Sequence, residues 1–342
     1  MDKYLISTEA TLRDAIAALN ALSGDVMTLL AVAPDGRLEG TLTDGDVRRA
    51  LLAGLDLSAA VKSAMHRNFR SLGADMTVAE IRAARAMGIR LLPIVDADGR
   101  VSSIIDLRHQ TTRLPIRAML MAGGRGERLR PLTDSTPKPL LKVGGRPIID
   151  RNIDALRRAG VEDITVSVRY LAEQIEAHFA GTEVRCVRET EPLGTIGACS
   201  MLPPSGAPTT LLMNSDLLTN ISLEDFYLHH EQQNNDITIA TISHMVSIPF
   251  AILTTDGDRV TGIEEKPTYT HYANGGIYLI RSEMLQSLQR ERRDAPDFIA
   301  DAIARGAKVG HFPISGLWLD IGTHADFRQA QELMKLTEAE NC

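Results

Sequence analysis

Hydrophobic and polar positions follow two different patterns along the chain, one before and one after about residue 115. In the first part, short apolar runs at Thr28–Val32 and Leu91–Val95 predict strands. Each run follows a segment with apolar residues at helical spacing. These segments open with Thr11 and Thr77, a residue type that favours the start of a helix. The pattern therefore predicts one α+β unit that occurs twice.

A repeated turn supports the duplication. Residues 35–38 (DGRL) recur as residues 98–101 (DGRV), and each copy lies between apolar runs. Units of this kind commonly pair to bury their hydrophobic faces. Two unrelated turns of similar composition are the alternative. We predict a front domain over residues 1–112, with units at about 1–55 and 60–112.

After a short boundary at residues 113–115, apolar runs that predict strands alternate with helical patterns. Such alternation indicates βαβ units and a parallel sheet that binds ligands at the carboxyl ends of its strands. We predict an α/β fold with a mostly parallel, Rossmann-like sheet over residues 116–342. The strands expected are 118–122, Ile164–Val168 and 184–187, and the helices are about 148–159 and 171–179.

The composition narrows the class of protein. The chain has 342 residues, of which 44% are hydrophobic, enough for a sizeable core and more than one domain. Acidic residues exceed basic ones, 44 against 37, and no long basic run occurs, so we expect no nucleic-acid partner. No segment resembles a signal peptide or has the roughly 18 apolar residues of a membrane span, so we expect a cytoplasmic protein without a membrane partner. The three cysteines show no CxxC spacing, which argues against a disulfide framework or a zinc site.

The first predicted strand of the second part runs into a glycine-rich segment with several cations, where a parallel sheet would bind a ligand. Glycine lets the backbone take positive φ and approach a ligand, and N–H groups and neighbouring cations bind phosphate oxygens. The segment therefore predicts a phosphate site, with an ordinary glycine-rich turn as the alternative. Its candidate residues are Ala122, Gly123, Gly124, Gly126, Arg128 and Lys138.

The same segment resembles a known family signature. Residues 123–129 (GGRGERL), followed by 131–133 (PLT) and 137–139 (PKP), are similar to the sugar-phosphate nucleotidyltransferases, which make NDP-sugars from an NTP and a sugar 1-phosphate. The resemblance covers about residues 117–333 and implies the nucleotide-diphospho-sugar transferase fold. It also implies that Ala122 and the three glycines bind the nucleotide, and that Arg128 and Lys138 are catalytic cations.

Residues 191–198 (EPLGTIGA) resemble the base-recognition loop of that family. The resemblance implies nucleotide-binding roles for Glu191, Gly194 and Thr195, with Gly194 allowing the backbone to approach the base. A turn in which Thr195 caps a helix is the alternative.

Two aspartates match the metal ligands of the family. Asp216 follows an apolar run at 211–213, and Asp320 lies in the segment 318–323 (WLDIGT). A carboxylate at the end of a strand can hold a hard cation, and the resemblance implies Mg²⁺ bound by this pair. A cap of the helix near Leu223 is the alternative role for Asp216.

A further set of residues matches the sugar-phosphate site of the family, namely Glu265 and Lys266 (in EEKP) and Asn274 and Gly275 (in NGG). The resemblance implies that Glu265 and Asn274 bind sugar hydroxyls and that Lys266 meets the phosphate. A surface turn is the alternative for EEKP. Ala251 stands where many members have a glycine that touches the sugar, which leaves the identity of the sugar open.

The front domain resembles a tandem pair of CBS domains, which sense adenine nucleotides. Thr43 and Asp46 match the T-x-x-D pattern that binds ribose, whereas the second copy has Asp106 and His109 at these positions. The resemblance implies a regulatory purine nucleotide at Thr43 and Asp46, and a homo-oligomer formed through the pair. The alternatives are a helix cap for Asp46 and a pair that only dimerises the enzyme.

The resemblance implies transfer of a nucleoside monophosphate from an NTP to a sugar 1-phosphate, with release of pyrophosphate, for glycan biosynthesis. The loop at 192–197 resembles guanylyltransferases more than thymidylyltransferases, and the CBS-fused layout resembles the glucosamine-1-phosphate guanylyltransferases. We therefore expect GTP with a hexosamine or hexose 1-phosphate. A uridylyl- or thymidylyltransferase acting on glucose 1-phosphate is one alternative. A non-catalytic nucleotide-sensing scaffold is another, although the chain keeps the charged residues of the family pattern.

Overall fold

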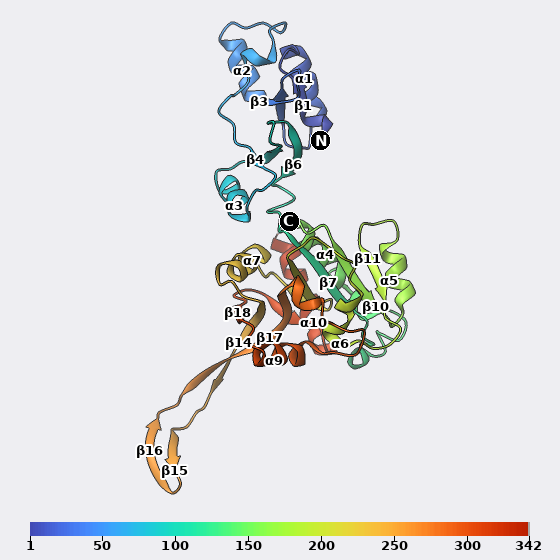
Figure 1. The fold of residues 1–342 in the computed structure, drawn as a ribbon, viewed down its shortest axis with the longest axis vertical. Helices are drawn as coiled ribbons and strands as arrows, with labels where there is room; N and C mark the ends of the chain where they lie inside the picture. Colours follow the sequence, from blue (N-terminus) through green and yellow to red (C-terminus); the bar gives the residue numbers. More distant parts are fainter. Residues whose placement is uncertain (341–342) are drawn as a thin grey trace. The chain divides into compact units, whose positions relative to one another are not determined.

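The computed structural model describes residues 1–340, and the chain divides into two compact units (Figure 1). The first unit is Met1–Arg113, and the second begins at Leu114. None of the helices among residues 1–340 is long and apolar enough to cross a membrane.

The first unit contains two small sheets with the same connectivity. In each sheet the first strand runs parallel to the second, and the second runs antiparallel to the third. The elements of the first half are η1 (Asp2–Tyr4), β1 (Leu5–Ser7), α1 (Leu12–Ala21), β2 (Thr28–Val32), β3 (Leu38–Thr43), α2 (Asp44–Leu52) and η2 (Val61–Ser63). Those of the second half are β4 (Leu72–Gly73), α3 (Val78–Ala86), β5 (Leu91–Val95) and β6 (Val101–Asp106).

Capping boxes define the helix starts of the first unit. Thr11 Oγ1 accepts a hydrogen bond from Asp14 N (3.2 Å), and the Asp14 carboxylate accepts one from Thr11 N (3.0 Å). Thr77 and Glu80 form the same reciprocal pair at the start of α3. The prediction that Thr11 and Thr77 open helices is confirmed, because the first N–H groups of a helix need partners outside the helix.

The second unit is built on a mixed sheet in which parallel strands predominate. Its strand order is β11-β10-β7-β12-β17-β14-β18. The first four of these are mutually parallel, β17 is antiparallel to both β12 and β14, and β18 is parallel to β14. The predicted α/β class with a parallel-rich sheet is confirmed. The strands are β7 (Ile116–Ala122), β10 (Ile164–Val168), β11 (Arg185–Arg188), β12 (Thr209–Asn214), β14 (Ile237–Ser247), β17 (Thr268–Arg281) and β18 (Val309–Pro313).

Helices of the second unit bury one apolar side. In α4, Ile149 and Ile153 are buried whereas Arg157 is exposed, as the spacing of its apolar residues requires. The helices are α4 (Ile148–Arg158), α5 (Ala172–Phe179), α6 (Gly194–Gly197), α7 (Leu223–Gln232), α8 (Ser282–Leu285), α9 (Ala295–Ala304) and α10 (His324–Glu340). Short elements complete the unit, namely η3 (Glu127–Leu129), η4 (Lys138–Leu140), β8 (Lys142–Val143), β9 (Arg146–Pro147), η5 (Ala198–Met201), β13 (Leu217–Thr219) and β19 (Trp318–Asp320).

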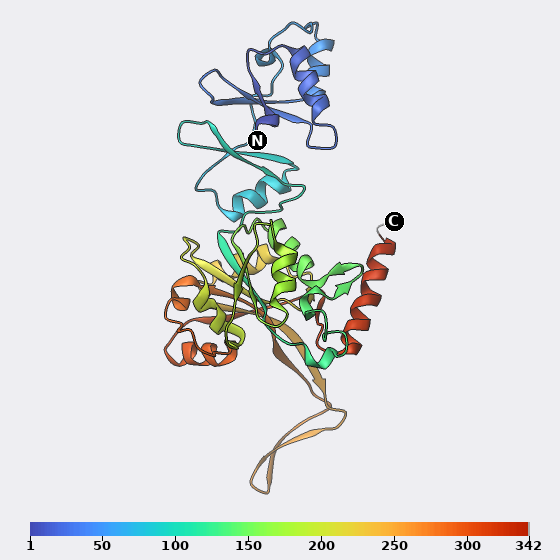
Figure 2. The same cartoon turned by 90° about the vertical axis from the view of Figure 1, so that its right-hand side faces the viewer.

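A two-stranded ribbon extends from the sheet of the second unit. β12 pairs with β17 only as far as Ile277, and β18 pairs with β14 only as far as Thr241. Beyond these points β14 and β17 pair with each other alone. The ribbon ends in a hairpin of β15 (Ile252–Asp256) and β16 (Arg259–Glu264). We call residues 242–273 the β arm, and Figures 1 and 2 show it projecting from the body of the second unit.

Candidate functional site

Three charged side chains from distant parts of the chain meet beside the carboxyl ends of β7 and β12. Lys138 Nζ donates a hydrogen bond to Asp216 Oδ2 and lies 3.7 Å from Asp320 Oδ1. The short strands β13 and β19 pair antiparallel, and Ile321 N donates a hydrogen bond to Asp216 O (3.1 Å). This pairing brings the two aspartates together, so that one ammonium group faces two carboxylates.

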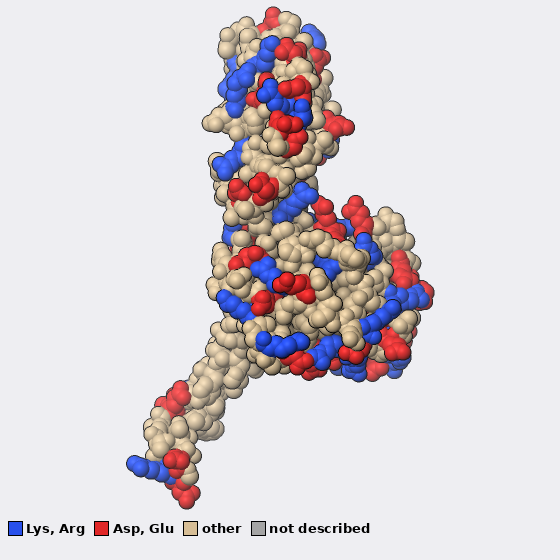
Figure 3. Space-filling model, in the orientation of Figure 1, with Lys and Arg blue, Asp and Glu red and all other residues tan. Residues whose placement is uncertain are grey.

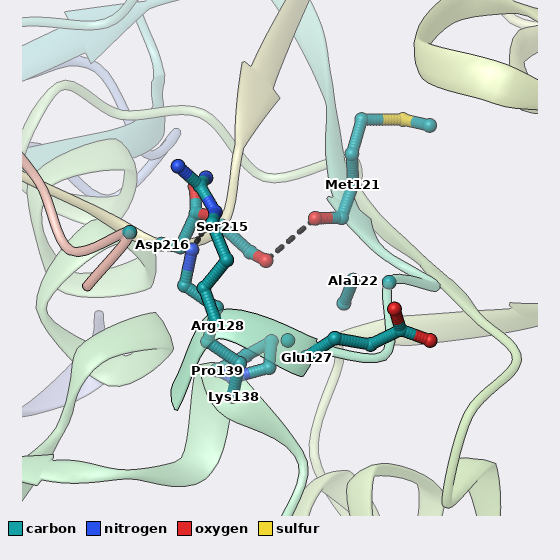
Figure 4. A pocket seen from close by; sticks show the side chains of 11 residues that line it. Met121, Ala122, Glu127, Arg128, Lys138, Pro139, Ser215 and Asp216 are labelled. Carbon is teal, nitrogen blue, oxygen red and sulfur yellow. Dashed lines mark hydrogen bonds and ion pairs between the residues drawn. The ribbon is translucent and has the colours of Figure 1, made fainter. Parts of the chain in front are cut away.

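Lys138 and Asp216 line a cavity of about 350 Å³, whereas Asp320 contacts Lys138 beside it without lining it. Figure 4 shows the side chains of Arg128, Lys138 and Asp216 gathered at this cavity. The Arg128 guanidinium packs against backbone, since a Cβ at Gly322 would lie only 3.0 Å from Arg128 Nη2. The residues predicted from the sequence that line the cavity are Ala122, Gly124, Gly126, Arg128, Lys138 and Asp216.

A second cavity, of about 300 Å³, shares Met121, Gly124 and Asp216 with the first. Two cavities that share lining residues can accept two substrates, or one extended substrate, around the same carboxylate. Glu191 is exposed and lines neither cavity. The other predicted nucleotide-binding residues at the second cavity are Gly123, Gly194 and Thr195.

The glycine turn after β7 makes close contacts that exclude side chains. Gly126 has φ +62°, and a Cβ there would lie 2.9 Å from Thr133 Cγ2. Thr133 Oγ1 in turn donates a hydrogen bond to Gly126 O (2.9 Å). A Cβ at Gly123 would lie 2.8 Å from Glu189 Oε1. A larger residue at Gly126 would strain the turn, so glycine is required there, whereas a larger residue at Gly123 would displace the Glu189 side chain.

The loop that leads into α6 is fixed on the first turn of α9. Gly194 has φ +75°, and a Cβ there would lie 2.5 Å from Arg293 O. Thr195 N donates a hydrogen bond to Asp294 Oδ1 (3.1 Å), and Thr195 Oγ1 accepts one from Ala295 N (2.7 Å). Thr195 therefore satisfies an N–H group at the start of a distant helix, and it makes no side-chain cap of α6.

The carboxyl group of Asp320 is in an unusual environment. Burial and the negative charge of Asp216 raise the pKa of Asp320 above its ordinary value, while Lys138 and Arg128 act in the opposite direction. The Asp320 Oδ1 atom is buried and has no hydrogen-bond partner. A buried polar atom without a hydrogen-bond partner is rare in folded proteins, and this oxygen can still accept a ligand.

The two aspartates fit a hard divalent cation, because carboxylate oxygens are its preferred ligands. Within residues 1–340, no group of three or more His, Cys, Asp or Glu side chains could hold a metal ion. A cation held by Asp216 and Asp320 would therefore complete its coordination with phosphate oxygens and water. The alternative role for Asp216, a helix cap, is not observed, since Ser222 caps α7.

The structure separates the four residues predicted for the sugar phosphate. Asn274 and Gly275 lie where β17 enters the sheet, and Trp318 Nε1 donates a hydrogen bond to Gly275 O (2.9 Å). Glu265 and Lys266 lie on the β arm and are exposed, and none of the four residues lines either of the two cavities. The residues predicted for one ligand thus fall into two groups.

Thr43 and Asp46 form a capping box at the start of α2. The Asp46 carboxylate accepts hydrogen bonds from Thr43 N (2.8 Å) and Thr43 Oγ1 (2.6 Å), and it pairs with Arg49. Burial opposes ionisation, but the hydrogen bonds from Thr43 and Arg49 outweigh it and lower the pKa of Asp46. The helix cap considered from the sequence is therefore present. A cavity of about 670 Å³ in the first unit includes Thr41 and Arg108 in its lining, but neither Thr43 nor Asp46.

Several residues at the two cavities were not predicted from the sequence. Ser215 lines the first cavity, and its Oγ donates a hydrogen bond to Met121 O. Arg169 and Glu189 line the second cavity. Both directly follow strands, β10 and β11, so the rule that selected Asp216 at a strand end would also have found them.

Sequence comparisons match the second unit to known proteins. A family model described as nucleotidyl transferase matches residues 117–336. The mannose-1-phosphate guanylyltransferase catalytic subunit beta of Drosophila pseudoobscura pseudoobscura is 32% identical over 224 residues, which cover 62% of this chain and 60% of the relative. The subunit of the same name from Danio rerio is 28% identical over 225 residues, which cover 62% of each chain. The chain thus spans less than two thirds of the length of these relatives.

A structural comparison agrees on the fold. A solved structure from Bacillus anthracis, of a protein assigned as a glucose-1-phosphate thymidylyltransferase and bound to sucrose, superposes with a TM-score of 0.51. The match has 24% sequence identity and covers 64% of this chain and 95% of the other. This likeness supports the architecture of the second unit.

Proposed function

The chain belongs to the nucleotidyl transferase family, and from this premise we propose that it transfers a nucleoside monophosphate from an NTP to a sugar 1-phosphate. The products are an NDP-sugar and pyrophosphate. The observation that carries the proposal is the convergence of the glycine turn, Arg128, Lys138 and Asp216 on two cavities that share lining residues, with Asp320 paired to the same lysine. The relatives named as guanylyltransferases support the same reaction class.

The reaction needs no protein base. The second pKa of a phosphate monoester is about 6, so roughly nine in ten sugar 1-phosphate molecules are dianions at pH 7. A phosphate oxygen forms a bond to the α-phosphorus of the NTP, and the bond from that phosphorus to the bridging oxygen of pyrophosphate breaks. Pyrophosphate leaves with the electron pair of the broken bond. The protein must therefore bring two anions together and reduce the repulsion between them.

We assign that task to side chains and backbone at the first cavity. Lys138 and Arg128 supply positive charge next to the α-phosphate, and N–H groups of the glycine turn hold the phosphate chain. Asp216 and Asp320 would hold Mg²⁺, which when bound neutralises phosphate oxygens. Thr195 and Gly194 would position the base, and Asn274 and Gly275 would position the sugar.

The rival function from another class is a non-catalytic scaffold that binds nucleotide. It is disfavoured because the chain keeps Arg128, Lys138 and both aspartates, with Lys138 facing the two carboxylates. Pyrophosphate release, followed with each NTP and sugar 1-phosphate in the presence of Mg²⁺, decides between the two. A folded protein that binds an NTP but releases no pyrophosphate with any pair would support the scaffold.

We expect GTP to be the preferred nucleotide, with a hexosamine or hexose 1-phosphate as the acceptor. The loop held by Gly194 and Thr195 keeps its backbone groups in place, and a site that hydrogen-bonds its substrate strongly rejects analogues without the matching groups. In a panel of GTP, ATP, UTP and dTTP with glucosamine, mannose and glucose 1-phosphates, kcat/KM for GTP should be at least about 100-fold above the pyrimidine nucleotides. A preference for UTP or dTTP with glucose 1-phosphate would establish the alternative transferase.

We further propose that the first unit is a CBS pair that binds a regulatory purine nucleotide at Thr43 and Asp46. The shared connectivity of its two sheets supports a duplicated unit. The capping box constrains how a ribose could bind at Asp46. A ribose hydroxyl would have to share or replace the hydrogen bonds that the Asp46 carboxylate accepts from Thr43. The nucleotide would change activity only if it bound two states of the enzyme with affinities that differ, usually by about 5- to 150-fold.

Asp46→Ala and Asp14→Ala separate the ribose role from the structural one. Both remove the carboxylate of a capping box, so both should lower the melting temperature modestly, but only Asp46 is a candidate ribose ligand. We expect AMP, ATP or GDP to bind wild type and Asp14→Ala alike, and Asp46→Ala at least about 10-fold more weakly, in calorimetric titrations of the full chain. If none of the three binds, or if binding leaves turnover unchanged, the first unit serves only architecture or dimerisation.

A further inference from the structure

The β arm exposes several large apolar side chains within one short segment of the chain. Figure 3 shows that charged residues on the arm gather towards its tip, while its length carries other residue types. A two-stranded hairpin is marginally stable on its own in water, and a contiguous exposed apolar surface marks an interaction site. The side chains concerned, each at least 40% exposed, are Met245, Val246, Phe250, Leu253, Val260 and Ile263.

The apolar residues of the terminal hairpin share one face. Leu253 lies directly opposite Ile263 in the β15–β16 register, and Val260 lies opposite Thr255. Residues two apart on a strand, and residues directly opposite across an antiparallel pair, project from the same side of a sheet. Leu253, Val260 and Ile263 therefore form one apolar surface that a single copy leaves uncovered.

The length of the arm separates residues that are proposed to contact one ligand. Lys266 precedes Asn274 by eight residues, and residues 268–274 are extended strand. At about 3.3 Å per residue, Lys266 and Asn274 are roughly 25 Å apart along the ribbon. A sugar phosphate is much shorter than this distance. One copy of the chain therefore cannot place both residues on the same sugar phosphate while the arm is extended.

The backbone at Lys266 gives an independent indication of a functional position. Lys266 has φ +44°, a left-handed conformation that residues other than glycine seldom adopt. The neighbouring backbone is fixed by a hydrogen bond from Ile248 N to Pro267 O (3.0 Å), which closes the ribbon beside it. Such strained residues gather at ligand sites, where the strain holds a side chain in a set direction. The strained residue here is an exposed lysine, the side chain assigned to a phosphate.

We propose that two copies of the chain exchange their β arms, so that Glu265 and Lys266 of each copy complete the sugar-phosphate site of the other. This inference rests on the proposed function, because it takes the sugar phosphate as the shared ligand. In the dimer the apolar face of Leu253, Val260 and Ile263 lies against the body of the second copy. A twofold axis makes the exchange reciprocal, which is the commonest symmetry of homodimers.

Two heterodimers with opposite expected outcomes test the exchange. Copies carrying different affinity tags are co-expressed, and the mixed dimer is purified through both tags. In the first heterodimer one copy carries Lys266→Ala and the other carries Asp216→Asn. The body of the first copy then receives an intact arm, so one of two sites is complete, and we expect about half of wild-type turnover per dimer.

In the second heterodimer one copy carries both substitutions and the other is wild type. Under arm exchange the wild-type body receives the altered arm and the altered body receives the intact arm. Only one site then keeps Asp216, and it lacks Lys266, so turnover should fall to about half that of the Lys266→Ala homodimer. If each arm instead folds back onto its own body, the two results are reversed: the first heterodimer falls to this low level and the second keeps about half of wild-type turnover. That reversal would overturn the proposal.

Sedimentation velocity on the full chain tests the interface without an activity assay. Wild type and Lys266→Ala should be dimers, and the double variant Leu253→Glu/Ile263→Glu should be a monomer. Thr254→Glu, on the opposite face of β15, is the matched control and should remain a dimer. A double variant that sediments as wild type does would overturn the docking of the arm. If wild type turns over no sugar 1-phosphate at all, the proposed function fails, and sedimentation still decides whether the arm joins two copies.

Discussion

Asp216→Asn and Asp320→Asn are each expected to lower the turnover number for pyrophosphate release by about 10²- to 10³-fold. Both carboxylates face the ammonium group of Lys138, and Asp320 Oδ1 is buried without a hydrogen-bond partner. Asparagine keeps the shape of the side chain but not its charge, so it would hold a divalent cation much more weakly. Turnover measured over a Mg²⁺ titration should show both the loss and a higher Mg²⁺ requirement.

Asp154→Asn is a matched control for these two variants. Asp154 pairs with Arg146 and lines neither cavity, so its substitution should leave turnover and the Mg²⁺ requirement unchanged. Melting curves of all three variants would show whether each is folded. Turnover near that of wild type in either site variant would remove that aspartate from the metal assignment.

Lys138→Met should lower kcat by about 10²- to 10³-fold and change KM for the NTP much less. The Lys138 side chain is only 11% exposed and is held by Asp216, so its charge is already positioned beside the proposed α-phosphate. A charge placed in advance stabilises the transition state more than the bound substrate, because negative charge increases there. Methionine has a similar length and no charge. Separate determination of kcat and KM therefore isolates the electrostatic effect.

The control for this variant is Lys142→Met, which removes an exposed lysine a few residues away on β8. It should leave both constants unchanged. A Lys138→Met enzyme whose entire loss lies in KM would mean that Lys138 binds the substrate and the transition state equally, contrary to the catalytic role proposed here.

Helices and strands could be predicted from the sequence where the local pattern of residues determines them. The strand Ile164–Val168 is buried along its whole length, and its β-branched residues, Ile164, Thr165, Val166 and Val168, favour a strand. The helices expected at 148–159 and 171–179 match α4 and α5 to within one residue. Thr11 and Thr77 were sufficient to fix the starts of two helices.

The composition of the site could be predicted, but its geometry could not. Gly126, Lys138 and Asp216 line one cavity, although their roles in the reaction stay predictions. Asp216 meets Asp320 through β13 and β19, strands of three residues each. Strands this short carry too little pattern to be recognised in a sequence. The contact of Thr195 with the start of α9 could not be predicted from the sequence either, because it joins residues far apart in the chain.

The β arm could not be predicted because its cause is not local. Residues 242–273 pair as ordinary antiparallel strands. They project as an arm because the neighbouring strands β12 and β18 end before residues 242–273 begin to pair. The sequence of residues 242–273 does not indicate where the neighbouring strands end.

The attachment of Thr195 to α9 has an entropic consequence for nucleotide choice. The backbone of the loop before α6 is held by Asp294 and Ala295 in the free protein, so few of its torsions remain to be restricted when a base arrives. A preorganised loop loses less conformational entropy on binding than a mobile one, and it discriminates between bases through fixed positions of donors and acceptors. If this loop binds the base as proposed, an altered base preference would require changes in the first turn of α9 as well as in the loop.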